Sequence, residues 1–280
     1  MEQKTVILEK RGEIGFLILN QPKRGNMLSR ALFAGIIQGL EELDVDNEVR
    51  LIIVKGLGDH FCYGADVHEI VILDKSKTGN FFLELNRMLL TFHRINKPSI
   101  AMVQGYATAG GFSIALSCDL IVASENAHFG PTAVNVGLFC AQTTAVMLPR
   151  IIGGKKALEM GLTGDLISAP EAERLGIVNR VVPHDRLESA TMELAEKILS
   201  KNPLAIAMGR RAFYDCADMG YDEGLKHAAE VLRQVGISDQ AKEGMMAFLA
   251  KRKPSYKRTI VYPASKPAEN DHDESTDSKK

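Results

Sequence analysis

The sequence predicts an α/β fold that ends in a helical region, and three observations support this prediction. A loop of small residues and a helix-like pattern follow a short apolar run twice, after residues 49–55 and after residues 98–103. Two β-branched runs near the N-terminus flank a glycine-containing turn and predict a hairpin. Apolar residues recur at helical spacing through most of residues 203–249. Strands alternating with helices form sheets covered by helices, so one large α/β domain is expected.

The composition agrees with a soluble chain that can bury a large core. Of the 280 residues, 45% are hydrophobic and 25% are charged. The net charge of −1 provides no overall cationic field, so neither nucleic acid nor an anionic membrane is an expected partner. The N-terminal segment predicts neither a signal peptide nor an anchor, and no apolar run approaches the length of a membrane span.

The cysteines show no metal-binding or disulfide pattern. They lack CxxC or Cys/His spacing, and three of them lie in apolar runs that are typical of free buried thiols. We therefore expect no metal, and a reducing, cytoplasmic compartment fits the chain best. The four cysteines are Cys62, Cys118, Cys140 and Cys216.

The N-terminal third predicts a hairpin followed by an amphipathic helix. The hairpin strands fall at residues 5–10 and 14–19, and a polar loop follows at 20–26. Ser29 is an N-cap candidate for a helix over residues 30–43, in which apolar residues recur at helical spacing. An apolar strand at 49–55 comes next.

The central stretch, residues 97–119, predicts strand, turn and helix. Gly105 permits an abrupt turn, and small residues up to Gly111 leave the backbone open before a helix that is expected to begin at about Phe112. The N–H groups of the first helical turn lack partners within the helix, so they can bind a negative oxygen. Small residues also suit close helix–strand packing, and this stretch alone does not separate the two interpretations.

A second small-residue loop makes the anion-binding interpretation stronger. It reads FCYGADVHE at 61–69 and follows the strand at 49–55. Two such loops can present two N–H groups to one thioester carbonyl, which is the arrangement that stabilises an enolate or tetrahedral oxyanion. With this pair of loops the chain resembles the enoyl-CoA hydratase/isomerase, or crotonase, superfamily. The matching motifs, in the family's order over most of residues 5–257, are FCYGADVHE at 61–69, KPSIAMVQGYATAGGFSIALSCDLIVAS at 97–124, FGPTAVNVGLF at 129–139 and EGMMAFLAKRKP at 243–254.

The resemblance implies a specific form of the α/β fold. It implies a spiral core of stacked ββα turns over residues 1–200, with two near-perpendicular sheets, and a helical region over 201–258 that builds trimers or hexamers of paired trimers. Residues 259–280 form a polar tail, and the composition of residues 266–280 predicts disorder. The implied activity is that of a lyase or isomerase of fatty acid metabolism. Its implied substrate is an acyl-CoA thioester, so coenzyme A belongs to the substrate and no cofactor is bound permanently.

The resemblance also assigns roles to named residues. By position in the motifs, the backbone N–H groups of Ala65 and Gly110 form an oxyanion hole. Lys23, Ala65, Asp66 and Val67 fall on family positions along the coenzyme A, although Asp66 more often organises its loop and caps a helix. Phe248 and Lys251 match positions that pack on adenine and contact phosphates, often from a neighbouring subunit. The alternative interpretation is that Phe248 only packs and that Lys251 and its basic neighbours are solvated charges. For Lys23 and Arg24 the alternative is two solvated charges in a loop.

The sequence departs from the family where a hydratase carries its two catalytic glutamates, because Ser113 and Ala133 stand there. Neither side chain can activate water and shuttle its proton. Three alternatives remain: an acyl-CoA enzyme whose acid and base lie elsewhere, an enzyme that relies on the oxyanion hole for decarboxylation or thioester cleavage, and a catalytically weak acyl-CoA-binding protein. The candidate acid/base or polar residues are Glu69, Glu84, His68, His93, Tyr106, Cys140 and Gln142.

Further expectations concern Cys140 and the segment of residues 71–94. Cys140 follows VNVGLF where some relatives carry an aspartate, but a packing thiol is the favoured interpretation because no neighbour predicts a lowered thiol pKa. VNVGLFC and the absent glutamates look most like the subgroup of enoyl-CoA hydratase domain-containing proteins. Residues 71–94, with a polar loop at 74–80 and a helical pattern at 81–92, are expected to wall the acyl group.

The remaining elements follow from local signals. A helix pattern runs over residues 143–150 and another over 155–161. Ser168 followed by Pro170 and Glu171 is a helix-start signature. A strand is predicted at 177–183 and an amphipathic helix at 185–200.

Overall fold

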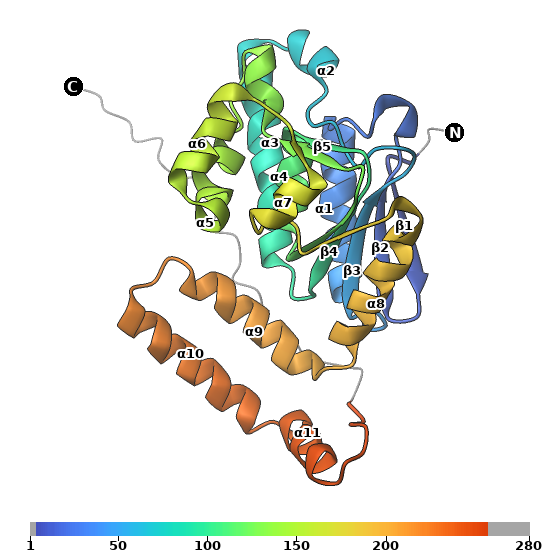
Figure 1. Cartoon of the computed structure of the whole chain (residues 1–280), viewed down its shortest axis with the longest axis vertical. Helices are drawn as coiled ribbons and strands as arrows, with labels where there is room; N and C mark the ends of the chain where they lie inside the picture. The colour runs from blue at the N-terminus through green and yellow to red at the C-terminus, as the bar shows by residue number, and fades with distance from the viewer. Residues whose placement is uncertain (1–3, 257–280) are drawn as a thin grey trace, which may run out of the picture.

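The computed structural model describes residues 4–256, so the predicted polar tail at 259–280 lies outside the described residues. The larger sheet has six strands, in the order β1-β2-β3-β4-β6-β9 (Figure 1). The predicted hairpin is confirmed, because β1 and β2 pair in antiparallel fashion, and every other pair of neighbours is parallel. The strands are β1 (Val6–Arg11), β2 (Ile14–Leu19), β3 (Leu51–Gly56), β4 (Ser99–Val103), β6 (Leu120–Ser124) and β9 (Arg180–Val182).

A smaller sheet of three strands lies beside it, in the order β5-β7-β8. Its strands are β5 (Tyr106–Thr108), β7 (His128–Gly130) and β8 (Ile167–Ser168). Along the chain, β4 and β5 belong to different sheets, as do β6 and β7 and then β8 and β9. Each such turn therefore contributes one strand to each sheet, and helices connect the turns.

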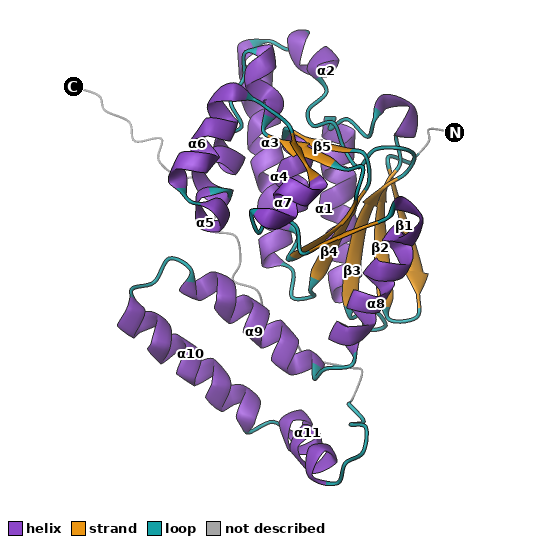
Figure 2. Ribbon diagram, in the orientation of Figure 1, coloured by secondary structure: helices purple, strands orange, loops and turns teal. Residues whose placement is uncertain are grey.

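Helices cover both faces of the larger sheet (Figure 2). In β2, Leu17 and Leu19 belong to the cluster formed with α1 (Arg30–Val45), α3 (Lys75–Arg94) and α4 (Gly110–Ser117). Phe16 and Ile18 belong to a second cluster formed with α8 (Leu187–Leu199). All six residues of β2 are buried, as expected for a strand that is covered on both faces.

Local signals fixed several helix ends as predicted. The Ser29 side chain accepts from the N–H of Leu32 at the start of α1, and the Ser168 side chain accepts from the N–H of Glu171 at the start of α7 (Ala169–Arg174). The remaining short elements are α2 (Val67–Val71), α5 (Pro149–Ile152), α6 (Gly154–Thr163), the 3₁₀ turns η1 (Pro22–Arg24), η2 (Thr132–Val136) and η4 (His184–Arg186), and the π-helix η3 (Gln142–Met147).

Four predicted boundaries were wrong. Residues 74–80 are not a loop, because the Asp74 side chain caps α3 by accepting from the N–H of Lys77 and the helix begins at Lys75. Helix α4 begins at Gly110 rather than near Phe112. The helix expected at 143–150 is divided into the π-helix η3 and α5, and the strand expected at 177–183 is reduced to β9.

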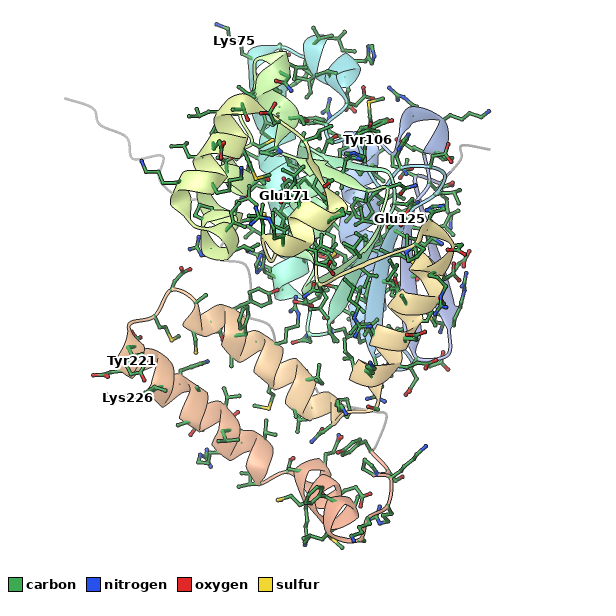
Figure 3. All side chains as sticks on the ribbon, in the orientation of Figure 1. Lys75, Tyr106, Glu125, Glu171, Tyr221 and Lys226 are labelled. Carbon is green, nitrogen blue, oxygen red and sulfur yellow. The ribbon has the colours of Figure 1, made fainter. Side chains whose placement is uncertain are left out.

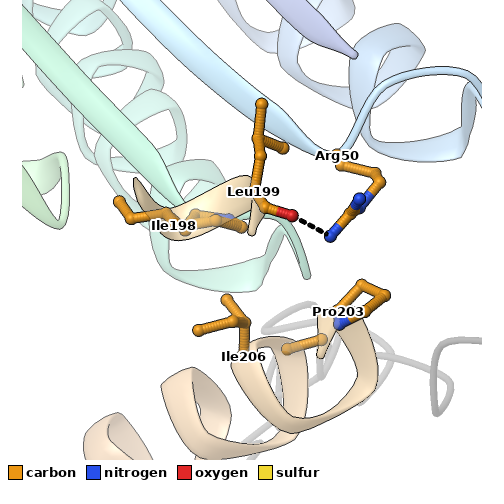
Figure 4. A pocket seen from close by; sticks show the side chains of 7 residues that line it. Arg50, Ile198, Leu199, Pro203 and Ile206 are labelled. Carbon is orange, nitrogen blue, oxygen red and sulfur yellow. Dashed lines mark hydrogen bonds between the residues drawn. The ribbon is translucent and has the colours of Figure 1, made fainter. Parts of the chain in front are cut away.

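The predicted helical C-terminal region consists of α9 (Pro203–Cys216), α10 (Tyr221–Gly236) and α11 (Asp239–Leu249), which we call the arm. The arm extends away from the sheets in Figure 1. At its base, the Arg50 guanidinium donates to the carbonyl oxygens of Leu199 at 2.9 Å and Lys201 at 3.1 Å, beside a small pocket lined also by Pro203 and Ile206 (Figure 4). Farther along, Arg210 forms an ion pair of 2.8 Å with Asp119 of the core.

Two sequence expectations concern the chain as a whole. None of the helices within residues 4–256 combines the length and the apolar character that crossing a bilayer requires. All four cysteines are free thiols; Cys62 and Cys118 are buried, and Cys140 and Cys216 are half-buried. Burial raises the pKa of the Cys62 thiol to about 12, so this thiol stays protonated and unreactive at neutral pH.

Candidate active site

The first candidate donor is the N–H of Ala65, and hydrogen bonds of the residues on either side of Ala65 set its direction. The Leu28 N–H donates to the Gly64 carbonyl oxygen at 2.8 Å, and the Asp66 N–H donates to the Leu28 carbonyl oxygen at 2.9 Å. In such a parallel bridge the middle residue turns its own N–H to the opposite side. Gly64 adopts φ +93°, which a side chain would strain, so the turn before Ala65 needs glycine.

The second candidate donor, the N–H of Gly110, is the first N–H of α4. The residue before it, Ala109, has φ 48° and ψ −119°, which is a strained conformation for an alanine. The Ala109 N–H donates to the Gly130 carbonyl oxygen at 2.8 Å, and the Ala109 carbonyl oxygen accepts from the Ser113 N–H. These bonds hold the strained peptide and thereby fix the direction of the Gly110 N–H.

The fold brings the two donors together. A Cβ atom placed on Gly110 would lie 3.7 Å from the Ala65 nitrogen, and one placed on Gly64 would lie 2.9 Å from the Gly110 nitrogen. A Cβ on Gly111 would lie only 2.1 Å from the Cys62 carbonyl oxygen, so glycine is required for this close approach. Within residues 4–256, neither donor N–H is engaged by a backbone or side-chain acceptor. Both are therefore available to an external oxygen.

A pair of hydroxyl groups occupies the position where the resemblance places the first glutamate. Ser113 on α4 and Thr143 in the π-helix η3 are both buried, and their hydroxyl oxygens lie 2.6 Å apart. The Ser113 hydroxyl also donates to the Ala109 carbonyl oxygen at 3.2 Å. Ala133, at the second position, lies in η2 and carries only a methyl group. Neither position supplies an acid or a base.

Four of the seven acid/base candidates are engaged in other contacts or have a pKa that burial shifts. Glu69 forms an ion pair of 3.1 Å with Arg30 at the start of α1. His93 packs edge-on against the Tyr214 ring, and burial lowers its pKa. Tyr106 packs among the rings of three neighbours. Burial raises the pKa of Cys140, which agrees with a packing thiol. The rings around Tyr106 are those of His60, Tyr63 and His128.

The other three candidates are less constrained. Glu84 is half-buried on α3, and within the described chain its carboxylate has no hydrogen bond or ion pair. His68 is exposed on α2, close in sequence to the Ala65 donor. Gln142 is half-buried as the first residue of η3. Among the seven, Glu84 and His68 are the titratable side chains that remain available.

Asp66 performs the structural role expected of it. Its carboxylate accepts from the His68 N–H at 3.1 Å and thereby caps α2. It also forms an ion pair with Arg24 at 2.5 Å, a contact that the sequence did not indicate. The Asp66 side chain is buried and Arg24 is half-exposed. Its contact with a ligand, like those of Lys23 and Val67, stays a prediction.

The structure does not bring Phe248 and Lys251 to the donors within one chain. Both lie at the end of α11, and in Figure 1 α11 and α2 occupy opposite ends of the molecule. Side chains of the arm, such as the labelled Tyr221 and Lys226, lie far from Tyr106 of the core (Figure 3). Phe248 is 82% exposed, so residues 4–256 leave most of its ring uncovered.

A large groove is separate from the donors. It has a volume of about 1100 Å³ and lies between the core helices and the arm. Ala65 and Gly110 do not line it. Its wall is mainly apolar and includes Leu89, Met147, Ile177 and Phe213.

Sequence reasoning missed how three residues shape the site. A strained alanine has no sequence signature, so Ala109 could not be singled out. Arg24 and Asp66 are 42 residues apart, and their pairing depends on how two loops meet. Thr143 could be found only by asking which residue faces Ser113, which again depends on the fold.

Comparison with known proteins extends over nearly the whole chain. The sequence profile of the family described as enoyl-CoA hydratase/isomerase matches residues 9–259. The short-chain-enoyl-CoA hydratase of Clostridium acetobutylicum is 33% identical over 254 residues, covering 90% of this chain and 97% of that protein.

Solved structures agree with the sequence comparison. Enoyl-CoA hydratase from Mycobacterium smegmatis superposes with a TM-score of 0.87 at 33% identity, covering 91% of this chain and 99% of that one. A structure described as enoyl-CoA hydrates subunit I from Geobacillus kaustophilus gives 0.85 at 37% identity, covering 91% and 98%. The predicted crotonase fold is confirmed, and the chain belongs to the enoyl-CoA hydratase/isomerase family.

Proposed function

We propose that this protein binds acyl-CoA thioesters and uses the N–H groups of Ala65 and Gly110 as an oxyanion hole for chemistry of the enoyl-CoA hydratase/isomerase type. The observation that carries the proposal is the pair of unengaged N–H groups, each preceded by a residue with positive φ. Preorganised donors of this kind lower a barrier because they need no rearrangement when charge develops on the thioester oxygen. Coenzyme A enters only as part of the substrate.

The proposed reaction passes through a thioester enolate. As its carbonyl oxygen gains charge, the Ala65 and Gly110 N–H groups donate to it, and the N-terminus of α4 adds a favourable dipole. The proton is handled by a group other than the usual glutamates. Glu84 and His68 are the candidates whose side chains are not engaged elsewhere in the described chain.

We further propose that the nucleotide end of the ligand is completed by a second copy of the chain, in a trimer or a hexamer built from trimers. Lys23, Asp66 and Val67 would contact coenzyme A from the same chain as the donors. Phe248 and Lys251 lie too far away in that chain, so they would come from a neighbour. The exposed apolar face of the arm supports this assembly, because isolated proteins rarely leave such surfaces uncovered. The cytoplasmic localisation and membership of the subgroup without glutamates stay predictions.

The test uses but-2-enoyl-CoA and the full chain. Calorimetry measures binding, loss of the conjugated-thioester absorbance measures turnover, and mass spectrometry identifies the product. Gain of one water supports hydration, and an unchanged mass with a moved double bond supports isomerisation. Binding without turnover would instead support an acyl-CoA-binding protein.

A matched pair of variants tests the oxyanion hole. Gly110→Pro removes the donor at the first position of α4 and should lower kcat/KM by about 100-fold, or roughly 3 kcal/mol. The Leu28 side chain must shift to admit the ring, because a Cβ atom at position 110 lies 2.8 Å from it. Gly154→Pro makes the same change at the first position of α6 and should leave turnover unchanged. Full activity in a folded Gly110→Pro variant would exclude this donor.

One observation favours a second candidate function. The Ser113 hydroxyl is bonded to Thr143, and Ala133 has no polar group, so neither glutamate position can activate water. Decarboxylation of a malonyl-type thioester needs no such base, since loss of carbon dioxide generates the enolate that the N–H groups stabilise. Incubation with malonyl-CoA should then release carbon dioxide and acetyl-CoA, and Gly110→Pro should suppress both.

A further inference from the structure

We infer that Arg24 is a positioning residue for the oxyanion hole: by holding the Asp66 carboxylate it fixes the direction of the adjacent Ala65 N–H. The inference rests on the proposed function, because it concerns the same donor. Arg24 lies in a loop 41 residues before Ala65 and does not itself donate to the reacting oxygen. Its effect would pass through Asp66, the next residue after Ala65 in the chain.

Asp66 is held by its N–H, by its carboxylate, and by its carbonyl oxygen, which accepts from the Glu69 and Ile70 N–H groups at 3.0 and 3.1 Å. Its N–H donates to the Leu28 carbonyl oxygen at 2.9 Å, one carboxylate oxygen accepts from the His68 N–H at 3.1 Å, and the other accepts from Arg24 at 2.5 Å. The first bond is half of the bridge that aims the Ala65 N–H. The two bonds to the carboxylate prevent it from rotating, and so prevent a rotation that would shift the Asp66 backbone.

The loop that carries Arg24 is itself rigid. The Asn26 side-chain amide donates to the carbonyl oxygens of Leu57 and His60 at 3.1 and 2.9 Å, and the Tyr63 N–H donates to the Gly25 carbonyl oxygen at 3.0 Å. A Cβ atom on Gly25 would lie 1.9 Å from the Tyr63 ring, so the two loops are in direct contact. Arg24 therefore reaches Asp66 from a fixed base.

The burial of the pair makes the arginine important. The Asp66 side chain is 3% exposed, whereas Arg24 is 50% exposed. Removing Arg24 would leave a buried carboxylate with the His68 N–H as its remaining partner among the described residues. Such a carboxylate moves toward water, because an unpaired buried charge is unfavourable. The Ala65 peptide is attached to it and would move as well.

This mechanism predicts a change in kcat rather than in KM. An oxyanion requires accurately placed donors more than a neutral carbonyl does, so misplacing a donor weakens transition-state binding most. Displacements of about 1 Å can lower rates by up to about 100-fold. A partial rotation of the Ala65 peptide should therefore lower kcat by about tenfold.

The experiment compares Arg24→Ala, Arg24→Lys and Arg186→Ala on the substrate that the wild-type chain turns over. Arg186 is a control, because it forms an exposed ion pair with Glu193 on the outer helix α8. We expect Arg24→Ala to lower kcat about tenfold with little change in KM, for both a CoA thioester and its pantetheine analogue. Arg24→Lys and added methylguanidinium should each restore part of the rate, and Arg186→Ala should match the wild type.

Several outcomes would overturn the inference. An unchanged kcat in Arg24→Ala would do so, as would a loss that neither Lys nor methylguanidinium relieves and that parallels a lower melting temperature. A raised KM for the CoA thioester alone would show that Arg24 binds phosphate instead. Failure of the proposed function looks different, since wild-type turnover would then be absent or would survive in Gly110→Pro.

Discussion

The core buries many of its large apolar side chains, whereas the arm exposes many of its own. All six residues of β2 are buried, and Phe33 and Phe81 pack edge to face at 4.9 Å within the core. Helix α10 of the arm has no buried residue, although its apolar residues recur on one face. The core therefore contains the partners that stabilise it, whereas the arm presents a surface that another surface must cover.

The largest expected difference between the regions comes from removing an aromatic ring. Phe33 is 1% exposed, so Phe33→Ala should lower the free energy of unfolding by about 3–5 kcal/mol through lost burial and a cavity. Phe213 on α9 is 71% exposed, and Phe213→Ala should change it by less than about 0.5 kcal/mol in dilute monomer. Denaturant unfolding measures both. Similar losses would show that the arm is packed like the core.

The next prediction concerns the contact between the two regions. Arg210 is nearly buried and donates to Asp119 and to the carbonyl oxygens of Phe92 and Ile95. Arg210→Ala leaves Asp119 without its cation and should weaken the docking of the arm by about 3 kcal/mol. Limited proteolysis should then remove the arm faster while the core stays intact.

The control for this variant lies on the arm itself. Arg233 forms an ion pair with Glu230 at 2.6 Å, but both side chains are exposed. Arg233→Ala should change stability by less than about 0.5 kcal/mol and leave the proteolysis rate as in the wild type. Equal cleavage of Arg210→Ala and wild type would mean that the base of the arm at Arg50 is sufficient to hold it.

Replacing glycine by alanine should change stability in opposite directions in the two regions. A Cβ on Gly111 meets the Cys62 carbonyl oxygen at 2.1 Å, so Gly111→Ala should destabilise the chain by about 2 kcal/mol and reduce turnover. Gly209 lies inside α9 with nothing within 4 Å of that position, so Gly209→Ala should stabilise it by about 0.5–1 kcal/mol. Melting temperatures measure both. Two changes of the same sign would contradict the comparison.

The last prediction compares a buried lysine of the core with the exposed lysines of the arm. Burial lowers the pKa of Lys97 to about 8, although nearby carboxylates oppose the shift. Between about pH 8 and 10.5 the unfolded chain retains a proton that the folded chain releases, so stability should rise with pH by up to about 1 kcal/mol per unit. Below pH 8 this group contributes no pH dependence.

Two variants check this assignment by denaturant unfolding over the same pH range. Lys97→Met should remove the rise, because the titrating group is gone. Lys226→Met, an exposed change on α10, should retain it. A rise that persists in Lys97→Met would assign the titration to another residue.

The features that sequence predicted are those set by neighbours in the chain. The hairpin of β1 and β2 and the caps at Ser29 and Ser168 depend on short segments, and the structure confirms them. The start of α3 was missed because residues 75–80 are polar and hide the cap at Asp74. The proposed donors could be placed by the family motifs.

What surrounds the donors could not be predicted, because it depends on contacts between distant loops. The Ser113–Thr143 pair joins a helix to a π-helix that has no sequence signature. The strain at Ala109 exists only because Gly130 and Ser113 hold its peptide on both sides. The family motifs named the proposed donors, and the fold determines how they are held.

The alternation of strands between the two sheets has a consequence for how such a protein can diverge. Ala65 and Gly110 lie on successive turns of the coil, and the parallel bridge between Cys62 and Ala107 sets the distance between those turns. The chain between the turns, including α2 and α3, can lengthen or change its side chains without altering that distance. The connecting segment can therefore vary in length and in side chains, while the spacing of the two proposed donors is inherited unchanged from the pitch of the coil.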